Sequence, residues 1–141
     1  MTDNDNRDFF LKEIDIIQSA INRMASNSFL IKGWTITLVV GVFLLKGTNM
    51  QIFIALIPIV MFWGLDAYFL YQERLFRARY KWVIENRQKS DDGLFDMDTS
   101  QFRQGVSIAS TFRSKTLLMF YLTILIITMI YIVHIYLGRP W

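Results

Sequence analysis

The sequence contains no cysteine and only one histidine among its 141 residues. The lack of cysteine excludes disulfides, thiolate metal ligands and a cysteine nucleophile, and one histidine cannot build a usual zinc site. A glycine-rich phosphate loop is also missing, and the acidic stretch 90–99 lacks the ligand order and closing glutamate of a calcium loop. No histidine lies near the serines of the polar segments to act as a base. We therefore expect no catalytic residue, no metal and no cofactor, and the protein is not predicted to be an enzyme.

Charged residues make up only 19% of the chain, whereas 53% of the residues are hydrophobic and 16% are aromatic. The mean hydropathy is positive, at +0.31. A soluble domain of this size could not cover so much apolar surface with polar side chains. The first six residues are polar and acidic, unlike the start of a cleaved secretory signal, so the first apolar run is expected to stay in the protein.

Three apolar runs are long enough to predict membrane-crossing helices, over 29–45, 51–71 and 116–137. A hydrocarbon core about 30 Å thick is crossed by about 20 mostly apolar helical residues. The first two runs form a hairpin around a short connection at 47–50. The predicted fold class is therefore all-α, an integral membrane protein with three transmembrane helices. Because the fully apolar part of the first run is short, this run either crosses completely or ends as a tilted, partly interfacial helix.

The distribution of basic residues predicts the orientation, because cytoplasmic flanks carry an excess of lysine and arginine. Only Lys46 and Arg139 lie on one side, and the other basic residues lie before the first run or between the second and the third. We expect three crossings, with the N-terminus in the cytoplasm and the C-terminus on the outer side of the membrane. The predicted divisions are a cytoplasmic amphipathic helix over 1–28, a transmembrane hairpin over 29–71, a cytoplasmic basic helical region with an acidic loop over 72–115, and the third span with a short outer tail over 116–141.

Two charged residues, Lys32 and Asp66, lie within the apolar hairpin. When the hairpin is reflected about the middle of its connection, the two residues come to nearly the same depth and can form an intramembrane ion pair. Ionisable groups in lipid are costly, face the interior of a helix bundle and usually pair. Such a pair either marks a conduction path or a gate, or it clamps the two helices while its side chains reach toward the headgroups. The clamp is the favoured alternative.

An amphipathic helix is predicted before the first span. Its apolar residues recur at spacings of four, three, four and three, and they form what we call the N-terminal seam: Phe10, Ile14, Ile17, Ile21 and Met24. Acidic neighbours such as Glu13 disfavour binding to an anionic leaflet. The seam is therefore expected to pack on another helix or on another subunit.

The second span is predicted to continue as one helix to about Asn86, because no proline or glycine interrupts it. A second short amphipathic helix is expected over 100–114. We define the basic surface as six residues of these two helices, of which the first three share one face and Arg79 lies to the side: Arg74, Arg77, Lys81, Arg79, Arg103 and Arg113. Such cations attract anionic lipid headgroups and set topology, which is the default interpretation. They can equally bind the phosphates of a nucleotide or a nucleic acid.

Three spans are few for a transporter monomer, which usually builds its site from repeats. A chain this small that moves ions must therefore assemble with copies of itself, usually with closed rotational symmetry. A ring of basic side chains at the inner mouth would favour anions and could receive a polyanionic regulator. The residues thus predict a homo-oligomeric pore. The competing prediction is a non-conducting membrane scaffold or anchor that recruits a cytosolic partner protein through the N-terminal seam.

Three segments of the hairpin and its extension carry a resemblance to a known group of proteins. They read Asn27-Ser28-Phe29-Leu30-Ile31-Lys32-Gly33-Trp34, Phe62-Trp63-Gly64-Leu65-Asp66-Ala67-Tyr68-Phe69-Leu70 and Glu73-Arg74-Leu75-Phe76-Arg77-Ala78-Arg79-Tyr80. Over residues 27–80 the chain resembles small bacterial inner-membrane proteins of anti-phage operons, the SLATT-like and Hailong-type membrane effectors encoded beside nucleotidyltransferases.

The resemblance implies a homo-oligomeric ion channel, expected to be a tetramer, in the bacterial inner membrane, with the C-terminus in the periplasm. Such a channel is held closed by an oligonucleotide made by the partner nucleotidyltransferase. It opens during infection and depolarises the cell, an abortive form of antiviral defence. On this resemblance, the basic surface would seat the inhibitor.

Overall fold

The structure is a computed structural model that describes residues 3–44, 53–87 and 93–137. These residues form helices and turns and contain no strand, which confirms the all-α prediction. The elements are α1 (Asp3–Leu44), α3 (Leu56–Asn86), the 3₁₀ helix η1 (Ser100–Gly105), α4 (Ile108–Phe112) and α5 (Lys115–Leu137).

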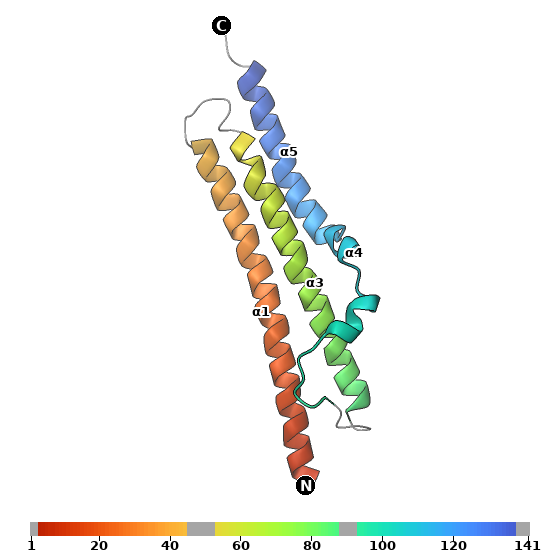
Figure 1. Cartoon of the computed structure of the whole chain (residues 1–141). Coiled ribbons are helices and arrows are strands. Elements are labelled where there is room, and N and C mark those ends of the chain that lie inside the picture. The colour runs from red at the N-terminus through yellow and green to blue at the C-terminus, as the bar shows by residue number, and fades with distance from the viewer. Residues whose placement is uncertain (1–2, 45–52, 88–92, 138–141) are drawn as a thin grey trace.

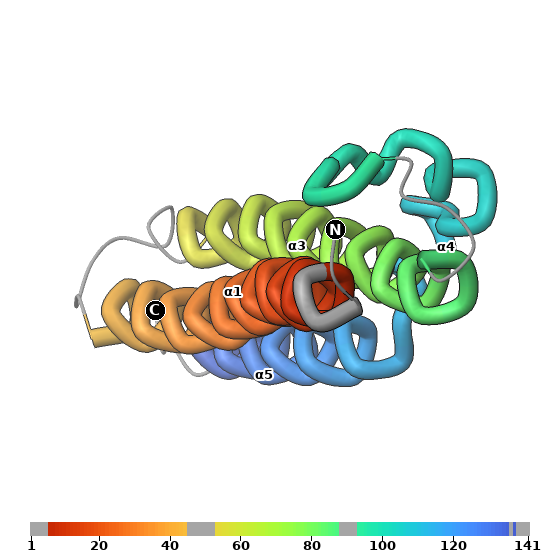
Figure 2. The backbone as a smooth tube through the Cα atoms, turned by 90° about the horizontal axis from the view of Figure 1, so that it is seen from below, coloured from red at the N-terminus to blue at the C-terminus, as the bar shows by residue number. Residues whose placement is uncertain are grey.

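The three long helices lie side by side, and α1 runs antiparallel to α3 (Figure 1). α5 packs along the half of α3 that lies nearest the start of α3 (Figure 1). The short elements η1 and α4 lie beside α3, off to one side of the long helices (Figure 2). We call residues 29–44, 53–71 and 115–137 the apolar half, and residues 3–28, 72–87 and 93–114 the polar half.

α1 continues without a break across the predicted boundary between the amphipathic helix and the first span. Its 42 residues make a helix about 63 Å long at a rise of about 1.5 Å per residue. This is about twice the thickness of a hydrocarbon core, so one rod carries both the polar N-terminal seam and the first apolar run. No proline interrupts it, and Gly33 and Gly41 lie inside it without ending the helix.

Within the residues that the structure describes, two helices are long and apolar enough to cross a membrane, judged by length and composition: the stretch Asn6–Leu44 of α1 and the stretch Lys115–Ile135 of α5. α3 is not among them, because its described part begins at Leu56 and the polar pair Gln72 and Glu73 soon follows Asp66. Two of the three predicted spans therefore have the required character in the structure. The second span stays a prediction, and its connection at 47–50 lies outside the described residues.

The polar half matches the predicted helices only in part. α3 extends to Asn86, as predicted, and the backbone N–H of Arg87 closes it on the carbonyl of Val83. The single helix predicted over 100–114 is wrong in its middle, because Val106 is extended and separates η1 from α4. Ser107 causes the new start, since its side chain accepts the backbone N–H of Ser110 as an N-cap.

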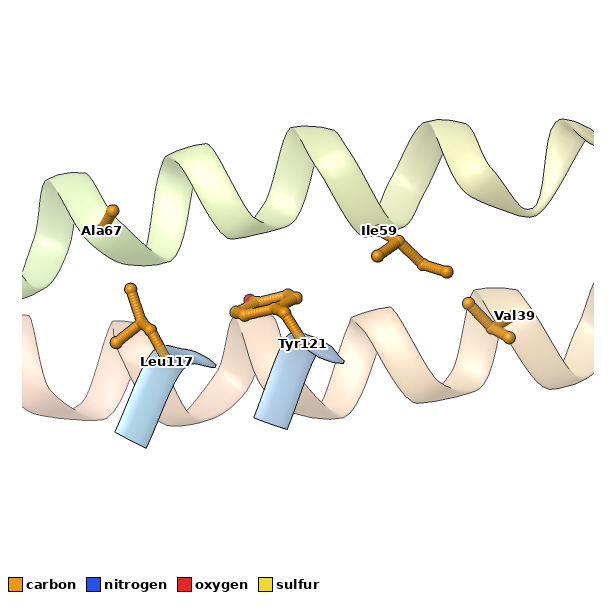
Figure 3. Packing of buried hydrophobic residues seen from close by; sticks show 5 residues of the cluster. All are labelled: Val39, Ile59, Ala67, Leu117 and Tyr121. Carbon is orange, nitrogen blue, oxygen red and sulfur yellow. The ribbon is translucent and has the colours of Figure 1, made fainter. Parts of the chain in front are cut away.

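The interior of the apolar half is filled by side chains from all three long helices. Val39 comes from α1, Ile59 and Ala67 come from α3, and Leu117 and Tyr121 come from α5 (Figure 3). All five are almost completely buried. The space between the three helices of one chain is thus a packed core.

Candidate functional site

The ion pair expected from the hairpin is present. Lys32 Nζ lies 2.5 Å from Asp66 Oδ2, and α1 and α3 bring the two residues together. The Asp66 side chain is completely buried, whereas 23% of the Lys32 side chain is exposed. The Lys32 ammonium also lies 5.9 Å from the ring centroid of Phe120 on α5, within reach of a cation–π interaction.

Hydroxyl groups from two helices complete the surroundings of the Asp66 carboxylate. Ser28 of α1 donates to Oδ1, and Tyr121 of α5 donates to Oδ2 over 3.2 Å. Ser28 also accepts from Lys32 Nζ at 2.9 Å. We call Ser28, Lys32, Asp66 and Tyr121 the charge cluster. A carboxylate that is buried away from water needs such donors, since an unpaired buried charge is very costly.

The charge cluster joins all three helices of the apolar half at one level. Its members satisfy one another, which supports the clamp that the sequence favoured. The packed residues around it, among them Leu117 and Ala67, fill the space between the helices (Figure 3). The cluster therefore holds the helices of one chain in register and does not line an opening within that chain.

The exposed face of α3 carries two cations that each have an acidic neighbour one helical turn away. Arg77 Nε lies 2.8 Å from Glu73 Oε1, and the Arg77 side chain is 62% exposed. Lys81 Nζ lies 3.8 Å from Glu85 Oε1 and its side chain is 78% exposed. Exposed ion pairs of this kind contribute little free energy. Both cations are thus free to turn toward an approaching phosphate, although Glu73 and Glu85 reduce the net positive charge of the face.

The remaining accessible cations lie near α4. Arg74 donates from Nη1 to Thr111 Oγ1 over 3.3 Å and so ties α3 to α4. Arg113 follows at the C-cap of α4 and is exposed, as is Arg103 at the end of η1. Five members of the predicted basic surface therefore keep an exposed or half-exposed side chain.

Arg79 is the sixth member, and its inclusion in the basic surface was wrong. Its side chain is only 2% exposed. It donates to the carbonyl of Asp98 over 2.9 Å and to that of Gly93 over 3.3 Å, and it lies 3.8 Å from the Glu13 carboxylate. Its position off the common face of α3 turns it toward α1. Arg79 is a structural residue that an external anion cannot reach.

Glu13 and Arg87 form a buried ion pair that the sequence analysis did not identify. Arg87 Nε and Nη2 donate to the two carboxylate oxygens of Glu13 at 2.7 and 2.5 Å, and Nη2 also reaches the carbonyl of Gly93. We call Glu13, Arg79 and Arg87 the buried clamp. A signal was available, because Glu13 precedes Ile17 of the N-terminal seam by four residues and therefore shares its face.

The buried clamp also fixes the described part of the acidic loop, which the sequence presented as a solvated loop. The carbonyls of Gly93 and Asp98 accept from the clamp. The carboxylates of Asp96 and Asp98 accept backbone N–H groups of the loop and of Ser100. Asp98 accepts the side-chain hydroxyl of Ser100 at 2.6 Å and the Ser100 backbone N–H at 2.9 Å. These two hydrogen bonds lower the pKa of Asp98 below its ordinary value of 3.8, and the bond from the hydroxyl has the larger effect.

The N-terminal seam packs on a helix of its own chain. Ile17 and Ile21 are buried against Val83 of α3, and Phe10 and Ile14 are partly buried beside them. Met24 is half-buried at the end of the seam. Of the two alternatives, another helix or another subunit, the structure contains the first.

Comparisons of the chain with protein-family models, with curated proteins and with solved structures found no match. In the part of the chain that the structure describes, no group of three or more histidine, cysteine, aspartate or glutamate side chains is placed to hold a metal ion. The argument for function therefore starts from the charge cluster, the basic surface without Arg79, and the apolar surface around them.

Proposed function

We propose that the chain is the subunit of a homo-oligomeric membrane pore whose cytoplasmic basic surface binds an anionic nucleotide or oligonucleotide. α1, α3 and α5 cross the inner membrane, with the N-terminus inside and the C-terminus outside. The pore acts in anti-phage defence by depolarising the membrane, and a partner nucleotidyltransferase supplies the regulator. A tetramer is the assembly suggested by the resemblance to Hailong-type and SLATT-like effectors.

The observation that carries the membrane part is the exposed apolar surface of all three long helices. Large apolar side chains point outward along the whole apolar half, among them Phe29, Trp34, Val60, Met61, Met119, Ile130 and Leu137. Soluble monomers rarely expose contiguous apolar patches larger than a few hundred Å². Lipid and neighbouring copies of the chain are the surroundings that such a surface fits.

The packed interior supports conduction between copies and not through one chain. Val39, Ile59 and Tyr121 fill the space among the three helices (Figure 3). Any ion path must then be lined by outward-facing residues of several subunits, which agrees with the small number of helices in each chain.

The regulator's chemistry follows from the accessible cations of the polar half. Arg77 and Lys81 project from α3, and Arg74, Arg103 and Arg113 lie on or beside η1 and α4. Guanidinium groups match phosphate oxygens in charge and in fork geometry. An oligonucleotide presents several phosphates at once, so it can engage cations from more than one subunit.

Ion flux from lipid vesicles tests this function. The full chain, reconstituted in vesicles with a potassium gradient, should dissipate the membrane potential reported by a voltage-sensitive dye. A short oligonucleotide should reduce that flux, and the double change Arg77→Glu and Lys81→Glu should weaken the block at least tenfold. Arg23→Glu, which reverses an exposed charge on α1 away from the basic surface, is the matched control. Vesicles that hold their potential at every protein density would contradict the pore.

The competing function, a non-conducting scaffold that binds a cytosolic partner through the N-terminal seam, has less support. Ile17 and Ile21 already face Val83 within the chain, so a partner would have to displace α3. Among the other apolar residues on this part of α1, Leu11 and Ile16 are the most exposed. Changing both to glutamate should leave the vesicle flux of a pore intact, whereas a scaffold would have no flux to preserve.

A further inference from the structure

Among the described residues, the Tyr121 side chain makes the hydrogen bonds between α5 and the other helices. The Tyr121 hydroxyl lies 3.1 Å from the carbonyl of Phe62 and 3.2 Å from Asp66 Oδ2, both on α3. Within the described residues, no other α5 side chain hydrogen-bonds to another helix. The other helix-facing hydroxyl of α5, that of Thr128, is buried without a partner in the same part of the chain.

The apolar contacts of α5 extend from Leu117 to Ile132, which are both buried, and include those of Tyr121. Leu117 lies one turn before it in the packed core, and the indole of Trp63 stacks on the Tyr121 ring with centroids 5.9 Å apart. Farther along, the ring of Tyr131 packs on Phe43 at 4.4 Å. Much of the remaining α5 surface faces outward. α1 and α3, in contrast, pack on each other along both the apolar half and the polar half.

The Asp66 carboxylate, which accepts the hydrogen bond from Tyr121, is held in place by side chains of α1. Ser28 bonds to Oδ1, and Lys32 pairs with the same Oδ2 atom that accepts from Tyr121. Before α5 begins at Lys115, Ser114 lies outside any helix.

We propose that Tyr121 is a latch and that α5 is a movable helix, which leaves the α1–α3 hairpin as a unit when the Tyr121–Asp66 contact is broken. Lys32 and Ser28 are positioning residues that keep the carboxylate aimed at the tyrosine. The hairpin itself, stabilised by the N-terminal seam and the buried clamp, stays intact during this movement. The latch does not depend on the proposed pore, because docking of α5 is a property of the single chain.

The absence of native cysteine makes a distance measurement straightforward. Spin labels are attached to Phe29→Cys on α1 and Met119→Cys on α5, two exposed positions, and the full chain is placed in lipid nanodiscs. An excess of unlabelled wild-type chain removes distances between subunits. Pulsed electron paramagnetic resonance then gives the distribution of distances between the labels on α1 and α5.

The wild-type latch should give one narrow distance, and Tyr121→Phe should add a second, longer distance. Because a hydrogen bond to a charged group is stronger than one between neutral groups, its loss should raise the undocked population about tenfold or more. Tyr131→Phe is the matched control on the same helix, because the Tyr131 hydroxyl makes no hydrogen bond within the described residues. Lys32→Gln should also raise the longer distance, and it serves as the second variant if the Tyr121→Phe chain does not fold.

Two results would overturn the latch. One is an unchanged single distance in both Tyr121→Phe and Lys32→Gln. The other is the same second distance in Tyr131→Phe as in Tyr121→Phe, since ring packing alone would then hold α5. Because no ion flux enters this measurement, its outcome is independent of whether the vesicles conduct.

Discussion

At the scale of single residues, the molecule depends on two buried sets of charges, one in each half. Asp66 in the apolar half and Glu13 in the polar half are both almost completely buried, and each accepts from donors on other parts of the chain. Such groups stabilise the fold only while every partner is present, because removing one leaves an uncompensated charge. The cost of a substitution should therefore depend on which partners remain.

Glu13→Gln should be among the most destabilising changes in the polar half. It removes the one carboxylate that Arg79 and Arg87 share in the described structure, so two buried guanidinium groups lose their counter-charge. The expected loss is about 3–5 kcal/mol in the free energy of unfolding, measured by denaturant titration of the polar-half helices. Glu85→Gln, at an exposed ion pair, should change it by less than about 1 kcal/mol. Equal effects of the two substitutions would contradict the buried clamp.

Asp66→Ala should also lower the free energy of unfolding, since it leaves the partly buried Lys32 ammonium without its counter-charge. The double variant Lys32→Met with Asp66→Leu should recover most of the lost stability, because it removes both charges and fills their volume. Lys81→Met is the control for the lysine change, at an exposed site. A double variant that is less stable than Asp66→Ala alone, by unfolding in mixed detergent, would show that the pair does more than balance charge.

At the scale of the elements, the local sequence predicts how long a helix is and how deep a residue lies along the hairpin. It does not predict contacts between distant segments. The unbroken run to Asn86 and the meeting of Lys32 with Asp66 follow from spacing and from the symmetry of a hairpin. The contact between Glu13 and Arg87 joins residues 74 apart in the chain. The periodicity of the sequence does not predict which cation pairs with a given carboxylate. Arg79 was misplaced for the same reason.

The sequence did not predict which element covers the N-terminal seam, for a related reason. Spacing of four and three shows that one face of α1 is apolar, and it does not show what covers that face. α3 covers it because α3 runs antiparallel beside α1 far enough to reach the seam (Figure 1). Likewise, the break at Val106 depends on one serine cap, a local choice that competes closely with a continuous helix.

The acidic loop gives a prediction for pH. The pKa of Asp98 is lowered in the folded chain, chiefly by the Ser100 hydroxyl, so the ionised form stabilises the loop. That stabilisation is complete above the ordinary value of 3.8 and is lost as the pH falls through the lower, folded value. Protease cleavage or hydrogen exchange at 93–99 should therefore increase below about pH 4. Asp98→Asn should remove most of this pH dependence. A pH profile of cleavage or exchange identical to that of the wild type would contradict a stabilising role of the Asp98 carboxylate.

At the scale of the whole molecule, the two halves have different surroundings. The apolar half exposes large apolar side chains on every long helix, and the polar half exposes cations such as Arg77 and Lys81. Composition predicted this division, and the packed core among α1, α3 and α5 adds a constraint (Figure 3). Since one chain encloses no path, the proposed conduction requires several chains.

The molecular mass of the full chain in lipid nanodiscs or mild detergent tests the central claim most directly. One chain has a mass of 16.7 kDa. The account predicts a discrete multiple of that mass, with four chains as the assembly suggested by the resemblance, and the same multiple should persist on dilution. A particle that contains a single chain at every concentration would contradict the pore.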